Sequence, residues 1–189
     1  MPRWGPDADN RLYLAAMELI FERGYDAVTV AEIAEHAGLR KRSFFRYFAD
    51  KREVLFAGSA DFEQAVVEAL RDAPAALRPV EAVVAALASA GSGLTAWGES
   101  VRQRHRVVRS SSELRERELI KLEALTVALA TELAGRGVAE PDATLVAQVG
   151  VAAFATSFQR WAEEPGAGSL DELMADALRR LRAELGDPS

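Results

Sequence analysis

Cysteine is absent from this 189-residue chain, and so are long uninterrupted hydrophobic runs. Without cysteine the chain can form neither disulfide bonds nor cysteine-ligated metal sites. No apolar run approaches the roughly 18 residues of a membrane-spanning helix. Residues 1–7 also lack the apolar segment of a secretory signal. We therefore expect a cytoplasmic protein without a membrane-spanning segment.

Histidine is also scarce, and the residue types of common catalytic sites are not grouped. His36 and His105 are the two histidines, and no pattern of a third ligand accompanies them, so we predict no metal site. The sequence shows no nucleophile–base arrangement, no glycine-rich phosphate loop and no supported pair of carboxylates. These absences predict that the chain is not an enzyme and needs no cofactor.

The residues that are abundant indicate an all-α protein with a real core, since 49% of the chain is hydrophobic. Alanine and leucine dominate and strand-like segments are few, which predicts about nine helices. The net charge is −6, yet residues 1–52 hold nine Lys/Arg against eight Asp/Glu. An acidic body with a local basic patch suits a protein that binds selected DNA sites rather than all DNA.

Residues 29–38 have the pattern of a short amphipathic helix that a glycine ends. Thr29 and Glu32 form a capping-box pair, in which each side chain can satisfy a free backbone N–H group of the other residue. The apolar residues that recur at three- and four-residue steps are Val30, Ile33, Ala34 and Ala37. Gly38 is expected to end the helix in a left-handed conformation.

Residues 40–48 have the pattern of a second, strongly basic helix. At 100° per residue, Phe44 and Phe48 share one side of this helix. Arg42 and Arg46 fall on the opposite side, one turn apart. Such a charge run can be the solvated face of an ordinary helix. Together with the preceding helix and its glycine turn, it predicts a helix-turn-helix whose second helix enters the DNA major groove.

The next few residues begin a further helix. Residues 39–52 hold six Lys/Arg and a single acid, Asp50. Asp50 and Glu53 repeat the capping pattern. Lys51 lies in the first turn of the new helix, where free N–H groups and the helix dipole favour a phosphate.

Residues 12–56 resemble the N-terminal part of the tetracycline-repressor (TetR) family of transcriptional regulators. The resemblance rests on three segments in the family's order and spacing, which are residues 15–25, 28–38 and 43–51. They correspond to the first helix, to the second helix, and to the recognition helix with the start of helix four. Residues 42–48 look most like a branch that includes regulators similar to the mycofactocin regulator.

The resemblance assigns roles position by position. The residues expected to contact DNA are Thr29, Arg40, Lys41, Arg42, Ser43, Phe45, Arg46, Tyr47 and Lys51. Among them, positions 41–43 and 45 are expected in the major groove, and positions 29, 47 and 51 on phosphates. Arg40 stands where relatives often have a small serine, Arg42 where they often have a small residue, and Tyr47 where histidine is usual. An operator sequence is therefore not transferable from a relative.

The resemblance implies a three-helix DNA-binding domain over residues 1–52 and a larger helical domain for effector binding and dimerisation over residues 53–189. We expect helix four as one continuous helix over about residues 51–71, joining the two domains and acting as the lever between them. The remaining helices are expected near residues 80–90, 95–110, 113–134, 142–161 and 170–185, with a Gly-Ser-Gly turn at 91–93.

Two groups in the larger domain are candidates for effector binding. Residues 102–109 hold four arginines and a histidine, which suits either an anion clamp that includes Arg104 or a solvated face paired with nearby glutamates. Phe154, Phe158 and Trp161 share a helix face, which suits a pocket wall, the core or a dimer contact. Trp97 suits either a pocket or the core.

The sequence therefore predicts a ligand-responsive repressor that binds a palindromic double-stranded DNA operator as a homodimer. The resemblance places the dimer contact on the last two helices and implies a small-molecule effector, for which apolar and acyl-CoA-like molecules are candidates. A helical ligand-binding or adaptor protein without specific DNA readout is the alternative. An enzyme is the third option, although no acid or base for it is apparent.

Overall fold

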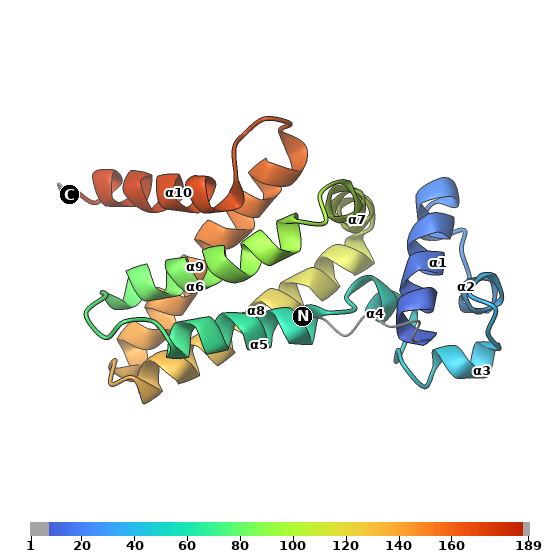
Figure 1. Ribbon diagram of the computed structural model, residues 1–189, viewed down its shortest axis with the longest axis horizontal. Helices are drawn as coiled ribbons and strands as arrows, with labels where there is room; N and C mark the ends of the chain where they lie inside the picture. Colours follow the sequence, from blue (N-terminus) through green and yellow to red (C-terminus); the bar gives the residue numbers. More distant parts are fainter. Residues whose placement is uncertain (1–7, 187–189) are drawn as a thin grey trace. The chain divides into compact units, whose positions relative to one another are not determined.

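The computed structural model describes residues 8–186, and every regular element in that range is a helix. The ten helices of these residues are α1 (Ala8–Arg23), α2 (Val30–His36), α3 (Lys41–Phe44), α4 (Lys51–Leu55), α5 (Ser59–Arg71), α6 (Pro79–Thr95), α7 (Glu99–Ser110), α8 (Ser112–Gly135), α9 (Glu140–Glu163) and α10 (Leu170–Glu184) (Figure 1). The predicted all-α class is confirmed. Residues 1–7, for which we expect no secretory segment, lie outside the described range.

The chain forms two compact units. Unit 1 contains the chain up to Gly58 together with Gln103–Glu118, and unit 2 contains Ser59–Arg102 and the chain from Leu119 onward. The helices α7 and α8 therefore contribute residues to both units. That the DNA-binding domain ends after residue 52 stays a prediction. Unit 1 includes more of the chain, because it extends to Gly58 and also contains Gln103–Glu118.

Unit 1 has its own hydrophobic core beneath the first three helices. Leu12 of α1, Ile33 of α2 and Phe44 of α3 have no exposed surface. The residues that α7 and α8 add to the same cluster are Val107, Val108 and Leu114. Each fully buried aliphatic side chain of this size contributes about 1.5–3 kcal/mol relative to exposure. The segment 103–118 is thus part of the core that holds α1–α3 together.

Unit 2 is organised around α6, which packs against α5, α9 and α10. The predicted turn at residues 91–93 is wrong, because α6 continues through this stretch. Gly91 is buried, and a Cβ atom there would lie 2.5 Å from Leu170 Cδ2. Gly91 therefore allows the Leu170 side chain to approach the α6 backbone closely, instead of forming the expected turn.

A second close approach joins α6 to α9. A Cβ atom on Gly150 of α9 would lie 2.3 Å from Cγ1 of Val83 on α6. Real Cβ atoms do not come this close to a neighbour, so a glycine at this position permits the crossing of the two helices.

The continuous helix expected over residues 51–71 is also wrong. The helix α4 ends at Leu55 and α5 begins at Ser59, which is why ten helices replace the expected nine (Figure 1). Gly58, between them, has a φ of +82°, a conformation that side chains with a Cβ rarely adopt. Phe56 is 4% exposed and packs in the core of unit 1. The residue that follows α4 therefore contributes a buried ring to this core.

The C-terminal end of α5 is capped by an arginine from a distant part of the chain. Arg136, just after α8, donates from Nη1 to the carbonyl oxygen of Leu70 at 2.7 Å and from Nη2 to that of Ala73 at 3.0 Å. A cation beside these terminal carbonyls also complements the helix dipole. The end of α8 is thereby fixed to the end of α5 within unit 2.

Candidate nucleic-acid interface

The helix α2 begins with the predicted capping box. The Glu32 N–H group donates to Thr29 Oγ1 at 3.3 Å, and the Thr29 N–H group donates to Glu32 Oε2 at 2.8 Å. The Thr29 hydroxyl also donates to Glu32 Oε2 at 2.7 Å, and Arg23 Nη1 donates to Oε1 at 2.8 Å. The hydrogen bonds from Thr29, reinforced by Arg23, hold the pKa of Glu32 at about 2. The box is therefore built around an ionised carboxylate.

Acid should weaken the capping box at the start of α2. The pKa of Glu32 lies below its ordinary value of 4.5, so its contribution to folding is complete above about pH 4.5 and is lost as the pH falls towards about 2. In Glu32→Gln, which keeps a capping side chain but does not titrate, the free energy of unfolding should fall less between pH 5 and pH 3. Urea unfolding followed by circular dichroism measures it.

The matched control for this experiment is Glu35→Gln in the same helix, because the Glu35 side chain makes no hydrogen bond within the described residues. It should retain the acid sensitivity of the native chain. An unchanged pH dependence in Glu32→Gln would mean that the box contributes no titrating group.

The helix α3 is shorter than expected. It ends at Phe44 instead of Phe48, and the chain continues as a tight turn. The Arg46 N–H group donates to the Ser43 carbonyl at 3.2 Å, and the Tyr47 N–H group donates to the Phe44 carbonyl at 3.0 Å. These are bonds to the third preceding residue, as in a 3₁₀ turn. The early end leaves room for Asp50 to adopt the extended backbone with which it caps α4.

The distribution of side chains around α3 follows the predicted two faces. Phe44 is fully buried and Phe48 is 8% exposed, with their ring centroids 5.4 Å apart. The expected DNA-contacting residues of this segment that are exposed are Arg40, Lys41, Arg42, Phe45, Arg46 and Tyr47. Ser43 is half-buried. Four cations and two aromatic rings are thus exposed within residues 40–47.

The other two residues expected on phosphates are already engaged within the fold. The Thr29 hydroxyl proton is donated to Glu32. Lys51 Nζ donates to the carbonyl oxygens of Tyr25 and Val28 at 2.8 and 3.0 Å, and lies 3.9 Å from the Tyr25 ring centroid. Lys51 therefore ties the start of α4 to the turn between α1 and α2. A phosphate at either residue would have to compete with these partners.

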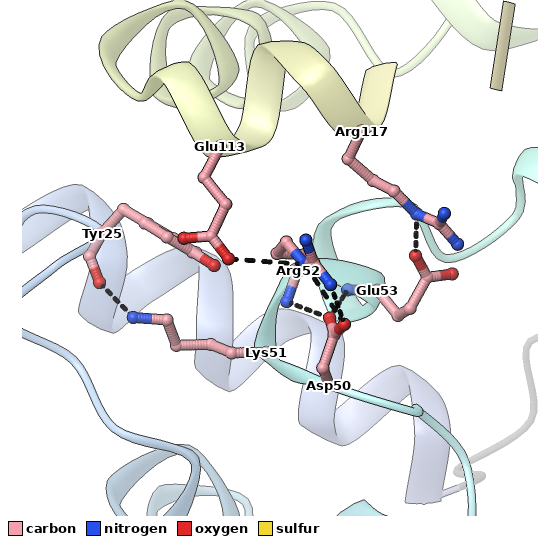
Figure 2. A network of polar contacts seen from close by, with 7 residues as sticks. All are labelled: Tyr25, Asp50, Lys51, Arg52, Glu53, Glu113 and Arg117. Atoms are coloured by element: carbon pink, nitrogen blue, oxygen red, sulfur yellow. Dashed lines mark hydrogen bonds and ion pairs between the residues drawn. The ribbon is translucent and has the colours of Figure 1, made fainter. Parts of the chain in front are cut away.

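The start of α4 is also held by the first turns of α8, within unit 1 (Figure 2). Asp50 accepts hydrogen bonds from the N–H groups of Arg52 and Glu53 at 2.8 and 3.2 Å. Its hydrogen bonds from the Arg52 side chain lower the pKa of the carboxyl group. Arg52 Nε lies 3.4 Å from Glu113 Oε1, and Arg117 donates to the Glu53 carboxylate. In one ion pair α4 supplies the cation, and in the other α8 supplies it. The two pairs together fix α4 to the start of α8.

Reversing one charge of an ion pair should lower the stability, and reversing the partner's charge as well should restore it. Glu53→Arg alone or Arg117→Glu alone should lower the free energy of unfolding by roughly 1 kcal/mol, and the double exchange should recover most of the loss. Urea unfolding of the four proteins gives the coupling free energy. The control is the same exchange at Arg160 and Glu164, an exposed pair 3.0 Å apart at the end of α9, where a few tenths of a kcal/mol are expected. Additive losses at Glu53 and Arg117 would contradict the pairing.

A row of aromatic rings lies in the core of unit 2. Ring centroids follow one another at 5.4, 5.9 and 5.8 Å along Phe62, Phe154, Phe158 and Trp161. The last three, which are predicted ligand-binding residues, are between 6% and 8% exposed. The Arg102 guanidinium lies 4.6 Å from the Trp161 ring centroid. The row is therefore part of a packed core that has a cation at one end.

The other two predicted ligand-binding residues lie outside this row. Trp97 is 61% exposed, between α6 and α7. Arg104 belongs to unit 1, where its Nε donates to the Leu55 carbonyl at 2.6 Å and its guanidinium lies 4.8 Å from the Phe56 ring centroid. Burial lowers the pKa of Arg104, and Glu118 lies 3.8 Å away as its counter-ion. Arg104 thus fixes the end of α4.

A groove of about 610 Å³ between α5 and α8 contains none of the five predicted ligand-binding residues. The residues that line it include Glu63, Gln64, Glu68, Arg71 and Glu132. Arg71 and Glu132 form an ion pair across it at 2.8 Å. Its lining is more polar than the aromatic row.

Comparison with protein families decides what the basic segment belongs to. Residues 12–57 match the model of bacterial regulatory proteins of the tetR family, and residues 77–186 match that of the MftR C-terminal domain. The chain belongs to the TetR family. The second match also agrees with the expected similarity to the mycofactocin-regulator branch.

Curated relatives of this TetR-family chain match a part of it. It is 36% identical over 74 residues to the HTH-type transcriptional regulator TcmR of Streptomyces glaucescens, covering 39% of this chain and 33% of TcmR. It is 39% identical over 71 residues to the transcriptional regulator AcuR of Cereibacter sphaeroides, covering 36% of this chain and 29% of AcuR. The chain thus spans about a third of the length of the curated relatives that it matches.

Solved structures of other transcriptional regulators, one of them described as a TetR-family repressor, match almost the whole chain. Thermus thermophilus FadR in complex with lauroyl-CoA has a TM-score of 0.58 and 26% identity, with 92% of both chains covered. Bacillus subtilis FadR in complex with stearoyl-CoA has a TM-score of 0.63 and 21% identity, over 91% of this chain and 96% of that one. The second likeness is one of fold.

The described residues hold no group of three or more His, Cys, Asp and Glu side chains that could bind a metal ion. His36 instead lies 2.8 Å from Glu18 of α1. No single helix among them is long and apolar enough to cross a membrane; α6 and α7 reach that length and apolar composition only when taken together, and they are bent by 103° relative to each other. Sequence reasoning missed Arg102, Arg117 and Arg136 as structural partners, because their contacts span long sequence separations.

Proposed function

We propose that this TetR-family chain is a transcriptional repressor that binds a palindromic DNA operator as a homodimer and is released by a small-molecule effector. The observation that supports this most directly is the exposed side of α3 and the turn after it. Four cations and two aromatic rings lie there on a segment of eight residues, 40–47. Cations reach phosphates and guanine edges, and a short helix of this kind fits the major groove. The protein would act in the cytoplasm, on the chromosome.

The dimer would form through α9 and α10. Support comes from exposed apolar side chains of these helices and of the residue that follows α10: Leu145 and Leu181 are 59% and 37% exposed, and Leu185, just after α10, is 75% exposed. A two-fold dimer uses the same surface on both copies. It would place two reading segments on half-sites about 34–36 Å apart, or a multiple of that distance.

The effector would be an apolar or acyl-CoA-like molecule bound in unit 2. The similarity to Thermus thermophilus FadR, which was crystallised with lauroyl-CoA, supports this class. The aromatic row from Phe62 to Trp161 would offer apolar walls if the core opened, and Arg102 would offer a cation for an anionic group. Binding of the effector would then lower the affinity for DNA, and binding of DNA would lower the affinity for the effector by the same factor.

Selection of fragments of host DNA with the purified chain at physiological salt tests the proposal. One enriched pseudo-palindrome is expected, and lauroyl-CoA should lower the affinity for it. Weak enrichment that salt abolishes, with no shared motif, would contradict the proposal and favour the adaptor alternative, because non-specific binding is mostly counter-ion release.

A further inference from the structure

The proposed function does not say which chemical group of the DNA is contacted by the exposed phenylalanine in the middle of the basic segment. Phe45 is 52% exposed, although it lies among cations and immediately after Phe44, which is fully buried. The Phe45 ring cannot donate or accept a conventional hydrogen bond. An isolated exposed apolar side chain is ordinary, but this one occupies the surface that would face DNA.

The position of the Phe45 ring is well fixed. Its backbone ends α3, with a φ of −70°, and its N–H group donates to the Ser43 carbonyl. Its ring centroid lies 5.6 Å from that of Phe44, with the ring planes at 75°, an edge-to-face contact. Because Phe44 is anchored in the core of unit 1, Phe45 presents a supported apolar surface outward.

The charges around Phe45 indicate what it meets. Arg42, Arg46 and Lys41 are all exposed on the same short segment, so the surroundings attract polyanionic DNA. In the major groove the base pairs present hydrogen-bond donors and acceptors, and the apolar group among them is the 5-methyl of thymine. We propose that Phe45 reads the methyl group of one thymine in each half-site of the operator. This inference rests on the proposed function.

Phe21 provides the matched comparison within the same unit. It is 53% exposed on α1, but its neighbours on that helix include Glu18 and Glu22. Carboxylates repel phosphates, so this equally exposed ring is not directed at DNA. Exposure alone therefore does not single out Phe45, whereas exposure among cations does.

The test uses the selected operator and replaces its thymines one at a time by deoxyuridine, which lacks only the methyl group. One thymine per half-site should be sensitive. Loss of one buried methyl corresponds to about fourfold weaker binding, and loss of one in each half-site to roughly 16-fold. Fluorescence anisotropy with the full chain at fixed salt measures the dissociation constants.

Three variants connect the methyl effect to this ring. Phe45→Ala should bind the thymine and deoxyuridine operators equally, and Phe45→Leu should keep part of the difference. Phe21→Ala should keep all of it. Circular dichroism should give the same thermal midpoint for Phe45→Leu and the native chain, which separates a lost contact from a lost fold.

Two results would overturn the inference alone. In the first, the native chain binds its operator but tolerates every thymine replacement. In the second, the sensitivity survives in Phe45→Ala, so that another group reads the methyl. A chain that selects no operator would instead overturn the proposed function, and the inference with it.

Discussion

Arg42→Ala is expected to weaken binding to the operator by about 1–3 kcal/mol per half-site, or roughly fivefold to 160-fold, and to relax its specificity. Arg42 is exposed in α3, on the side opposite the buried Phe44. A guanidinium in this position can donate two hydrogen bonds to the O6 and N7 atoms of a guanine. Removing it would leave these acceptors without their partner.

The measurement is a pair of titrations, one with the selected operator and one with an unrelated duplex, at two salt concentrations. Arg109→Ala is the control, because Arg109 is an exposed arginine of the same unit that lies outside α3. It should change neither affinity by more than a small factor. Equal losses on both duplexes in Arg42→Ala, with a flatter salt dependence, would show that Arg42 holds a phosphate instead of reading a base.

Gly150→Ala should destabilise the chain by about 1–3 kcal/mol, although alanine is intrinsically the better helix former. The added Cβ atom would lie 2.3 Å from Val83 Cγ1. Valine is short and branched at Cβ, so its methyl group cannot move away without a change of rotamer. The two helices would therefore have to separate, and the contacts of α6 with α9 would loosen. Urea unfolding measures the change.

Two glycines of α6 act as controls. At Gly93 an added Cβ atom would have no neighbouring atom within 4 Å, so Gly93→Ala should stabilise the chain by about 0.5–1 kcal/mol. Gly91→Ala should cost less than Gly150→Ala, because the nearest atom is the flexible end of Leu170. Equal effects at positions 93 and 150 would mean that the close crossing at Gly150 does not disfavour a larger residue.

Local signals in the sequence predicted several features of the local structure around residues 29–48. The capping box at Thr29, the glycine stop at Gly38 and the two faces around Phe44 depend on neighbours within a few residues. Such patterns are visible in one stretch of chain. The proposed DNA contacts of residues 40–47 lie together for the same reason, and their roles stay predictions.

Long-range packing explains what the sequence did not reveal. A glycine in a helical pattern can mark a turn, as Gly58 does, or a close approach, as Gly91 does, and the local sequence is the same kind of signal in both cases. Arg104 has the sequence pattern of an anion clamp, yet its partner is the Leu55 carbonyl, 49 residues away. Which arginine meets which distant group depends on the completed core.

The discontinuous make-up of unit 1 limits how such regulators can be recombined. Val107, Val108 and Leu114 lie in the same core as Phe44, although more than 60 residues separate them in the chain. A chimera that joined residues up to 58 to the body of another regulator would replace these three side chains with unmatched ones. A transplant that also carries residues 103–118 would keep the core and the ion pairs of Glu113 and Arg117. A single crossover after residue 58 would therefore separate unit 1 from part of its own core.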